Sequence, residues 1–385
     1  MKIIRTSTIP KSIDTFCRGL LRQLQDEEDM EVVVVSSPGH EMDEISQREG
    51  VKTISVPMQR RISPFKDLRS LWQLYRVFRY EKPVMVHSMT PKAGLLSMIA
   101  AWIARVPVRL HTFTGLVFPT STGLQRHILM LTDRITCACA THIIPEGEGV
   151  RNDLLSHRIT RKPLRVLGHG NIRGIDLCHF DPTLPEISNL AANIRQPDRL
   201  TFIFIGRIVG DKGINELISA FTRLHHERPN TRLLLIGGYE PELDPINPDT
   251  EQTICQHPAI EAVGQQQDVR PWLAASNIFV FPSYREGFPN VVIEAGAMGL
   301  PSIVTDINGS REIISHGENG VIIPPRNTEA LYSVMHQLTD NHELRTLLAS
   351  KARDMIASRF EQGFVRNCLI EYYKSILPTI KQNTR

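Results

Sequence analysis

Hydrophobic residues along this chain come in short runs that alternate with longer amphipathic stretches. In the first half, the strand-like runs are residues 2–5, 31–36, 53–56, 84–88, 108–112, 141–144 and 164–167, and helix-like segments lie near residues 11–25, 65–81, 92–105 and 122–132. Strands that are apolar throughout, with helices between them, are typical of a parallel sheet covered on both faces. The pattern predicts a doubly wound α/β domain over residues 1–180.

A second series of the same kind begins at Thr201. Its strand-like runs are residues 201–206, 231–236, 260–263, 278–281, 302–305 and 321–323. Between the two series, prolines at 182, 185 and 197 and a lack of periodicity predict a linker over residues 178–199. We therefore expect a second Rossmann-like domain over residues 200–360 and a C-terminal helix in 361–385 that returns to the first domain.

Composition agrees with two folded domains. The chain has 385 residues, of which 41% are hydrophobic and 22% are charged, enough for about two cores. None of its six cysteines forms a Cys-x-x-Cys pair, so we expect reduced structural thiols and no metal site. The N-terminus leads directly into a strand without a signal-peptide pattern, which predicts a cytoplasmic protein.

Charge is unevenly distributed. Residues 51–182 contain 19 Lys and Arg but only 8 Asp and Glu, which predicts an anionic ligand or lipid surface as partner, and no nucleic acid is expected. The apolar segment Ala93–Ala104, between Lys92 and Arg105, is shorter than the roughly 20 residues that span a bilayer. It is either a helix packed on the sheet or a helix partly exposed to a membrane surface.

The turn after the strand at 201–206 has phosphate-binding character. It reads Gly206-Arg207-Ile208-Val209-Gly210-Asp211-Lys212-Gly213, and an amphipathic helix follows. Arg207 and Lys212 would stand beside a helix N-terminus, where phosphate oxygens are stabilised. The alternative is a plain turn with solvated cations. It is no Walker loop, because Gly-Lys-Ser/Thr is absent.

Two carboxylates, Glu286 and Glu294, bracket the next strand-to-helix connection. The strand at 278–282 precedes Glu286, and Asn290 is placed to cap a helix whose Val291 and Val292 amides would face a ligand. Glu294 lies among apolar residues, where a carboxylate needs a partner. It either binds hydroxyl groups, such as those of a ribose, or favours the helix dipole.

Taken together, these motifs resemble the retaining glycosyltransferases of family 4, which have the GT-B fold of two Rossmann-like domains facing a cleft. The resemblance rests on the segments 206–213, 263–264, 268–269, 281–288, 294–301 and 305–306. It implies that Arg207 and Lys212, with Gly206, neutralise the diphosphate of a nucleotide sugar. It places Glu286 on the donor sugar, Glu294 on the ribose, and Val263 and Gly264 at the base. It implies no metal or other cofactor, and the chain has no Asp-x-Asp motif.

The first half resembles the branch of that family that builds capsular polysaccharide and other lipid-linked glycans. The resemblance rests on residues 87–94 and 106–115, and it places His111 near the donor sugar. Many members carry Gly-Gly after the first strand, where this chain has Ser7-Thr8-Ile9-Pro10-Lys11-Ser12. We expect Ser7, Thr8, Lys11 and Ser12, together with Lys92, to bind the acceptor through their side chains.

The expected function is transfer of a hexose or N-acetylhexosamine from a UDP-sugar to an undecaprenyl diphosphate-linked glycan, with retention, in surface polysaccharide synthesis. The protein would work at the inner face of the plasma membrane as a peripheral protein. Two alternatives stay open at this point. A UDP-sugar epimerase of the same fold would use the same diphosphate site without an acceptor, and a non-catalytic subunit would only bind the nucleotide sugar.

Overall fold

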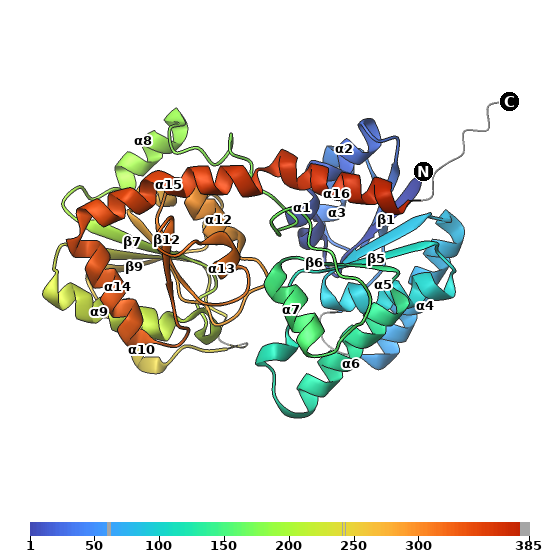
Figure 1. The fold of residues 1–385 in the computed structure, drawn as a ribbon, viewed down its shortest axis with the longest axis horizontal. Coiled ribbons are helices and arrows are strands. Elements are labelled where there is room, and N and C mark those ends of the chain that lie inside the picture. The colour runs from blue at the N-terminus through green and yellow to red at the C-terminus, as the bar shows by residue number, and fades with distance from the viewer. Residues whose placement is uncertain (60–62, 241, 243, 378–385) are drawn as a thin grey trace. The chain divides into compact units, whose positions relative to one another are not determined.

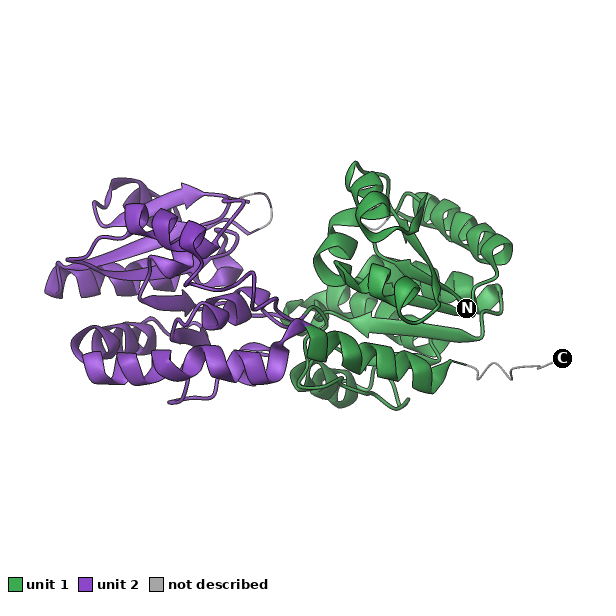
Figure 2. Ribbon diagram, turned by 90° about the horizontal axis from the view of Figure 1, so that it is seen from above, with its two compact units in different colours: residues 1–173, 363–385 green, residues 174–362 purple. Residues whose placement is uncertain are grey.

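A computed structural model describes the chain except for residues 60–62, 241, 243 and 378–385. The chain forms two compact units (Figure 2): unit 1 comprises residues 1–173 and the C-terminal segment from Gly363, and unit 2 comprises residues 174–362. The division after Arg173 falls before the expected linker, which instead contains a helix, α8 (Pro185–Ile194). Ile187 of this helix is buried in the core of unit 2, and this burial explains why the proline-rich stretch is ordered.

Unit 1 is built on a six-stranded parallel sheet with the order β3-β2-β1-β4-β5-β6. The strands are β1 (Lys2–Thr6), β2 (Glu31–Ser36), β3 (Lys52–Ser55), β4 (Met85–Met89), β5 (Val108–Phe113) and β6 (His142–Pro145). The apolar runs predicted these six strands. The seventh run, at 164–167, forms only an isolated bridge from Leu164 to Ile143, next to Pro163, which has no N–H to offer a ladder.

Helices cover both faces of this sheet (Figure 1). One layer contains α1 (Pro10–Cys17), α2 (Leu20–Asp26), α3 (Glu41–Glu49) and α16 (Gln362–Ile376), and the other contains α4 (Pro64–Glu81), α5 (Pro91–Ile103), α6 (Gly123–Cys139) and α7 (Glu148–Ser156). A short 3₁₀ helix, η1 (Phe118–Thr120), precedes α6. Most of α5 is buried in the second layer, so the segment 93–104 is a packed helix.

The single helix expected near residues 11–25 is two helices, α1 and α2, and this prediction was wrong. Gly19, with φ +73°, separates them. A Cβ at Gly19 would lie 2.7 Å from the guanidinium of Arg366 on α16. The break thus coincides with a left-handed glycine, and the Arg366 side chain lies beside it and donates to the Arg18 carbonyl at 2.5 Å.

Helix α16 is joined to unit 1 by a buried polar cluster. Arg5, only 1% exposed, donates to Tyr373 of α16, to His87 Nδ1 at 2.6 Å and to Cys17 Sγ at 3.1 Å. Because a guanidinium can only donate, Nδ1 is the accepting nitrogen of His87 and Nε2 carries the proton, which it donates to Thr112 Oγ1 at 2.7 Å. Burial lowers the pKa of His87 well below its usual value, so the ring is neutral.

Unit 2 repeats the architecture with a parallel sheet of order β12-β11-β10-β7-β8-β9. Its strands are β7 (Leu200–Ile205), β8 (Thr231–Ile236), β9 (Ile260–Gly264), β10 (Ile278–Phe281), β11 (Ser302–Thr305) and β12 (Gly320–Ile323). Its helices, besides α8, are η2 (Gly210–Lys212), α9 (Ile214–Glu227), α10 (Pro248–Gln256), α11 (Arg270–Ala274), α12 (Asn290–Ala297), α13 (Ser310–Ile313), α14 (Thr328–Asp340) and α15 (His342–Phe360).

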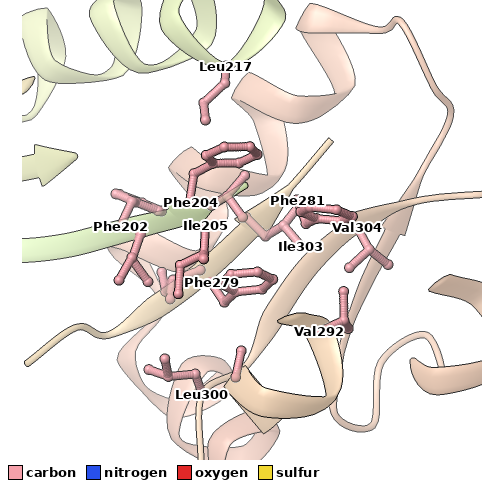
Figure 3. Close-up of a cluster of buried hydrophobic side chains, with 14 of the residues drawn as sticks. Phe202, Phe204, Ile205, Leu217, Phe279, Phe281, Val292, Leu300, Ile303 and Val304 are labelled. Atoms are coloured by element: carbon pink, nitrogen blue, oxygen red, sulfur yellow. The ribbon is translucent and has the colours of Figure 1, made fainter. Parts of the chain in front are cut away.

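The core of unit 2 lies directly beneath the loops that carry the predicted chemistry. Phe202 and Phe204 of β7 and Phe279 and Phe281 of β10 are packed with residues of α9 and α12 (Figure 3). The rings of Phe204 and Phe281 are stacked with centroids 6.0 Å apart. Large rigid rings thus fix the ends of the two central strands.

No helix in the described part of the chain is long and apolar enough to cross a membrane.

Candidate functional site

Both sheets change the direction of their strand order at the centre. In unit 2 the reversal lies between β7 and β10, and in unit 1 it lies between β1 and β4. In open parallel sheets the loops at such a point diverge at the carboxyl ends of the strands and leave space for a ligand. The loops after β7 and β10 contain the Lys212 and Glu286 segments, so the predicted donor residues occupy this position in unit 2.

Lys212 and Glu286 form an ion pair across that reversal. The same carboxylate oxygen accepts a hydrogen bond of 2.9 Å from Ser283 Oγ, and Lys212 Nζ lies 5.5 Å from the centre of the Phe281 ring. The two charged side chains are 12% and 18% exposed. A cation and an anion are thereby held in a fixed place, and sequence reasoning had assigned them to different parts of a ligand.

Glycines allow the two loops to approach. Gly213, with φ +72°, follows Lys212, and a Cβ there would lie 2.2 Å from the carbonyl oxygen of Pro282. A Cβ at Gly237, directly after β8, would lie 1.8 Å from the carbonyl oxygen of Gly206. Any side chain at these positions would push the β7 loop away from its neighbours, so the glycines position Lys212.

Arg207, the second predicted cation, also has a carboxylate partner. Its guanidinium lies 3.1 Å from Glu240, and both side chains are partly exposed. Asp211, in the same β7 loop, has two further partners: its amide donates to Asp244 at 2.5 Å, and its carboxylate pairs with Arg285 at 3.1 Å. Sequence reasoning missed Glu240 and Asp244, because they follow a different strand, β8, and carry no motif of their own.

Helix α12 differs in detail from the expectation. Asn290 is its first residue, and the cap position belongs to Pro289, which makes no side-chain capping bond. The Val292 amide, which was expected to face a ligand, donates to the Pro289 carbonyl at 3.1 Å in a tight turn at the helix start. Val291 is half-buried. Glu294 is 8% exposed, so its side chain lies on the buried side of α12.

Val263 and Gly264 end the edge strand β9. The Gly264 carbonyl accepts a hydrogen bond of 3.0 Å from the Gly237 amide, and Gln266 donates to the Val263 carbonyl at 2.8 Å. Like the Lys212 loop, this backbone lies at the carboxyl ends of the strands. In the sheet order, β9 is two strands away from β7. Val263 and Gly264 are thus near the far end of the row of loops that begins at Glu286.

In unit 1 the strand reversal is bridged by Thr8, after β1, and Thr90, after β4. Their hydroxyls are 2.8 Å apart, and Thr8 Oγ1 also accepts from the Ala93 amide at 3.2 Å, at the start of α5. Thr90 has φ +69°, a strained conformation for a β-branched residue. Sequence reasoning missed Thr90, since nothing in a Thr-Pro pair indicates a positive φ.

The five predicted acceptor residues are not equivalent. Ser7 and Thr8 are buried, and their hydroxyls bond within the protein, Ser7 Oγ to the Ile9 carbonyl at 2.5 Å. Lys92 pairs with Asp67 at 2.5 Å and is 12% exposed. Lys11 is exposed to solvent and Ser12 is half-buried. These two side chains are therefore the most accessible of the five.

His111 lies on β5 and is buried inside unit 1. Its Nδ1 is 2.8 Å from Ser88 Oγ, and its ring packs edge-on against Phe113 at 4.5 Å. Burial lowers the pKa of His111 to about 3, so the imidazole is neutral at physiological pH. Gly94 of α5 makes room for it, because a Cβ there would lie 2.3 Å from His111 Cε1.

A small cavity adjoins this histidine. Among the residues that line it are His111, Thr90, Thr132 and Asp133, and burial raises the pKa of Asp133 to about 7. Unit 2 has a wider groove of about 550 Å³ between α9 and α10, which contains none of the predicted residues. No three His, Cys, Asp or Glu side chains in the described ranges are grouped to hold a metal ion.

Two family models match the chain, one for each unit. Residues 13–170 match a "Glycosyl transferase 4-like domain", and residues 199–341 match "Glycosyl transferases group 1".

Known proteins resemble the chain over nearly its full length. The capsular polysaccharide biosynthesis glycosyltransferase CapM of Staphylococcus aureus is 32% identical over 98% of this chain and 97% of its own. An Escherichia coli UDP-Gal:alpha-D-GlcNAc-diphosphoundecaprenol alpha-1,3-galactosyltransferase is 27% identical over 81% of each. The structure of Anabaena HepE in complex with UDP-glucose superposes with a TM-score of 0.79 at 17% identity, over 97% of this chain and 100% of that one, and shows the same GT-B fold.

Proposed function

The chain belongs to the group 1 glycosyltransferases, and from that premise we propose that it transfers a hexose or N-acetylhexosamine from a UDP-sugar to an undecaprenyl diphosphate-linked glycan. The family membership rests on the relative that matches it from end to end. The donor, the acceptor and the stereochemistry are the parts that we propose.

The observation that carries the proposal is the Lys212–Glu286 pair at the strand reversal of unit 2. A cation beside a helix N-terminus stabilises the diphosphate that departs with UDP, and a carboxylate next to it accepts hydrogen bonds from sugar hydroxyls. Binding a diphosphate would replace Glu286 as the nearest anion to Lys212. The carboxylate would then be released to the sugar at the moment when the donor binds.

Around this pair we assign the other donor contacts. Arg207 is the second cation for the diphosphate and would exchange Glu240 for it. Glu294, on the buried side of α12, binds the ribose, and the backbone at Val263 and Gly264 frames the base. With two cations on the leaving group, we propose that transfer needs no divalent metal and proceeds in a chelator.

The UDP and lipid parts of the proposal come from relatives. The name of the E. coli relative states UDP-Gal as donor and a diphosphoundecaprenol-linked GlcNAc as acceptor, and the HepE structure contains UDP-glucose. On the acceptor side we assign the exposed Lys11 and the half-buried Ser12. His111 is not an acceptor residue in this assignment, and we keep it as the residue near the donor sugar. A lipid-linked acceptor places the protein at the inner face of the plasma membrane.

Retention at the anomeric carbon is part of the proposal. In this scheme the acceptor hydroxyl approaches from the side of the departing UDP, and a phosphate oxygen takes its proton. Lys212 and Arg207 hold that phosphate in position, so neither Glu286 nor Glu294 acts as general base.

The test is a panel of UDP-sugars in two assays. Protection against thermal unfolding identifies the donor, because a ligand present at about 100 times its Kd stabilises by about 2.7 kcal/mol. The selected donor is then incubated with an undecaprenyl diphosphate-linked acceptor and with EDTA. We expect UDP release and an α-linked product from an α-linked donor. An isomerised UDP-sugar without acceptor would show an epimerase instead, and a β-linked product would refute retention.

A further inference from the structure

The outer face of α4 has an unusual composition. Its exposed side chains are Phe65, Lys66, Leu68, Arg69, Trp72, Arg76, Arg79 and Tyr80, which we call the docking face. Phe65 is 90% exposed, Trp72 56% and Tyr80 82%. Single exposed apolar residues are ordinary, but four that share one face of a helix form a patch that marks an interaction site.

Both acidic residues of α4 lie away from this face. Asp67 pairs with Lys92 of α5 at 2.5 Å, and Glu81 is 3% exposed and pairs with Lys2 at 2.8 Å and Lys52 at 2.5 Å. The opposite side of the helix is fully packed by Ser70, Leu74 and Phe78, among others. The docking face therefore carries four cations and no carboxylate, and its aromatic residues are not needed for the core.

The cations and aromatic rings of the docking face are interleaved. The Arg76 guanidinium lies 4.7 Å from the centre of the Trp72 ring, so a cation and an amphipathic ring are presented together. At the end of the neighbouring helix α5, Trp102 is 58% exposed and Ile103 48%. Helices α4 and α5 pack against each other, so unit 1 carries these further exposed apolar residues on the helix next to α4.

We infer that the docking face binds the surface of an anionic bilayer, an inference that rests on the proposed use of a lipid-linked acceptor. The arginines contact lipid phosphates, while Phe65, Leu68 and Trp72 enter the boundary between headgroups and acyl chains. Aromatic and apolar residues on one face of a helix with basic residues around them are the composition of interfacial helices.

A second copy of the chain fits this face less well. In a two-fold dimer the same patch meets itself, so the four cations of one copy would face the four cations of the other. An anionic lipid surface neutralises these cations and covers the rings at the same time. The segment 93–104, for which the sequence left open a packed helix or a partly exposed membrane helix, is mostly buried, and Trp102 and Ile103 near its end are its exposed large apolar residues.

The test is flotation of the full chain with vesicles of phosphatidylcholine alone or mixed with phosphatidylglycerol. We expect binding only to the anionic vesicles and its loss at high salt. In Arg69→Gln/Arg76→Gln/Arg79→Gln, the partition coefficient should fall on the order of a hundredfold, about fivefold for each cation removed. Phe65→Ser/Trp72→Ser should weaken binding at every salt concentration, because insertion is lost.

The control changes one exposed apolar residue and one exposed basic residue on unit 2. Leu347→Ser/Lys351→Gln removes an exposed leucine and an exposed lysine four residues apart on α15, and its binding should equal that of the unaltered protein. Equal binding of the triple arginine variant, or loss of a dimer in Phe65→Ser/Trp72→Ser without an effect on flotation, would overturn the inference.

Activity on a detergent-dispersed acceptor separates this inference from the proposed function. The arginine variant should transfer sugar to the dispersed acceptor at the unaltered rate while it loses transfer to acceptor in vesicles. If the unaltered protein transfers sugar but does not float with anionic vesicles, only the docking face is refuted. If it floats but transfers nothing from any UDP-sugar, only the proposed function is refuted.

Discussion

The Lys212 ammonium and the Glu286 carboxylate are paired across the point where the strand order of the unit 2 sheet reverses. The pair couples the two residues that we assign to the leaving group and to the sugar. Each is the other's partner before a donor arrives. Changing either one should therefore alter the environment of the second in a predictable direction.

Glu286→Gln should separate binding from transfer. Glutamine keeps the shape and can still accept from Ser283, but it no longer neutralises Lys212. UDP should bind as tightly as before or about threefold tighter, because the ammonium is free for the diphosphate. Transfer should fall at least tenfold, because the contact to the sugar loses its charge. Titration calorimetry with UDP and initial rates give the two numbers, and weaker UDP binding with normal transfer would contradict the assignment.

Gly94→Ala should displace His111. The added methyl group would lie 2.3 Å from His111 Cε1, so the ring must leave its place beside Ser88. Overpacking of this kind costs about 1–3 kcal/mol, and urea unfolding should show it. Ser97→Ala on the same helix is the control. The buried Ser97 hydroxyl has no hydrogen-bond partner among the described residues, so its removal should leave stability unchanged or raised. An equal loss in both variants would argue against the contact with His111.

The acid limb of the stability curve should report His111. Because burial lowers the pKa of His111 to about 3, the unfolded chain takes up a proton below its ordinary pKa of about 6.5 while the folded chain does not. The free energy of unfolding therefore falls by ~1.4 kcal/mol per pH unit between these values on account of this group. Asp133, whose pKa burial raises to about 7, acts in the opposite direction over part of the range.

The difference in the free energy of unfolding between His111→Gln and the unaltered protein reports the titration of His111, because Asp133 and His87 are present in both. Urea unfolding at several pH values from 7 to 4.5 should give a gap between the two proteins that narrows as the pH falls. A constant gap would mean that the imidazole is protonated equally in both states.

Tyr373→Phe should loosen α16 from unit 1. The phenol is hydrogen-bonded to Arg5 and lies 2.5 Å from His87 Nδ1, so its loss leaves buried polar groups with fewer partners. The expected loss is about 1–3 kcal/mol in urea unfolding. Tyr372→Phe is the neighbouring control, because that ring packs against Arg165 at 5.2 Å. The proposal of a polar attachment is refuted if the control loses as much.

Much of the fold was predictable because buried parallel strands are continuous apolar runs. The continuous apolar runs Phe202 to Ile205 and Val32 to Val35 indicated buried strands, and the glycines after β7 indicated a tight turn. The proximity of Arg366 to Gly19 was not predictable, because the two residues are more than 300 positions apart in the sequence. A helix pattern read locally contains no trace of such a contact.

The individual residues of the candidate site were predictable, but the ion pair between Lys212 and Glu286 was not. Motifs identified Lys212 and Glu286 separately, and only the adjacency of β7 and β10 brings them together. The exposure of Phe65 and Trp72 was hidden for a different reason: hydrophobic periodicity cannot tell an apolar face that meets a core from one that meets solvent. The structure shows that α4 has both.

The most direct test of the central claim is UDP release from the preferred UDP-sugar with a lipid diphosphate-linked acceptor, measured for the unaltered protein, Lys212→Ala and the surface control Lys351→Ala. We expect turnover of Lys212→Ala to fall about 10²–10³-fold, as for loss of a group that stabilises developing charge, with cooperative unfolding retained. The control should be fully active. Unaltered turnover in a folded Lys212→Ala protein would contradict the account.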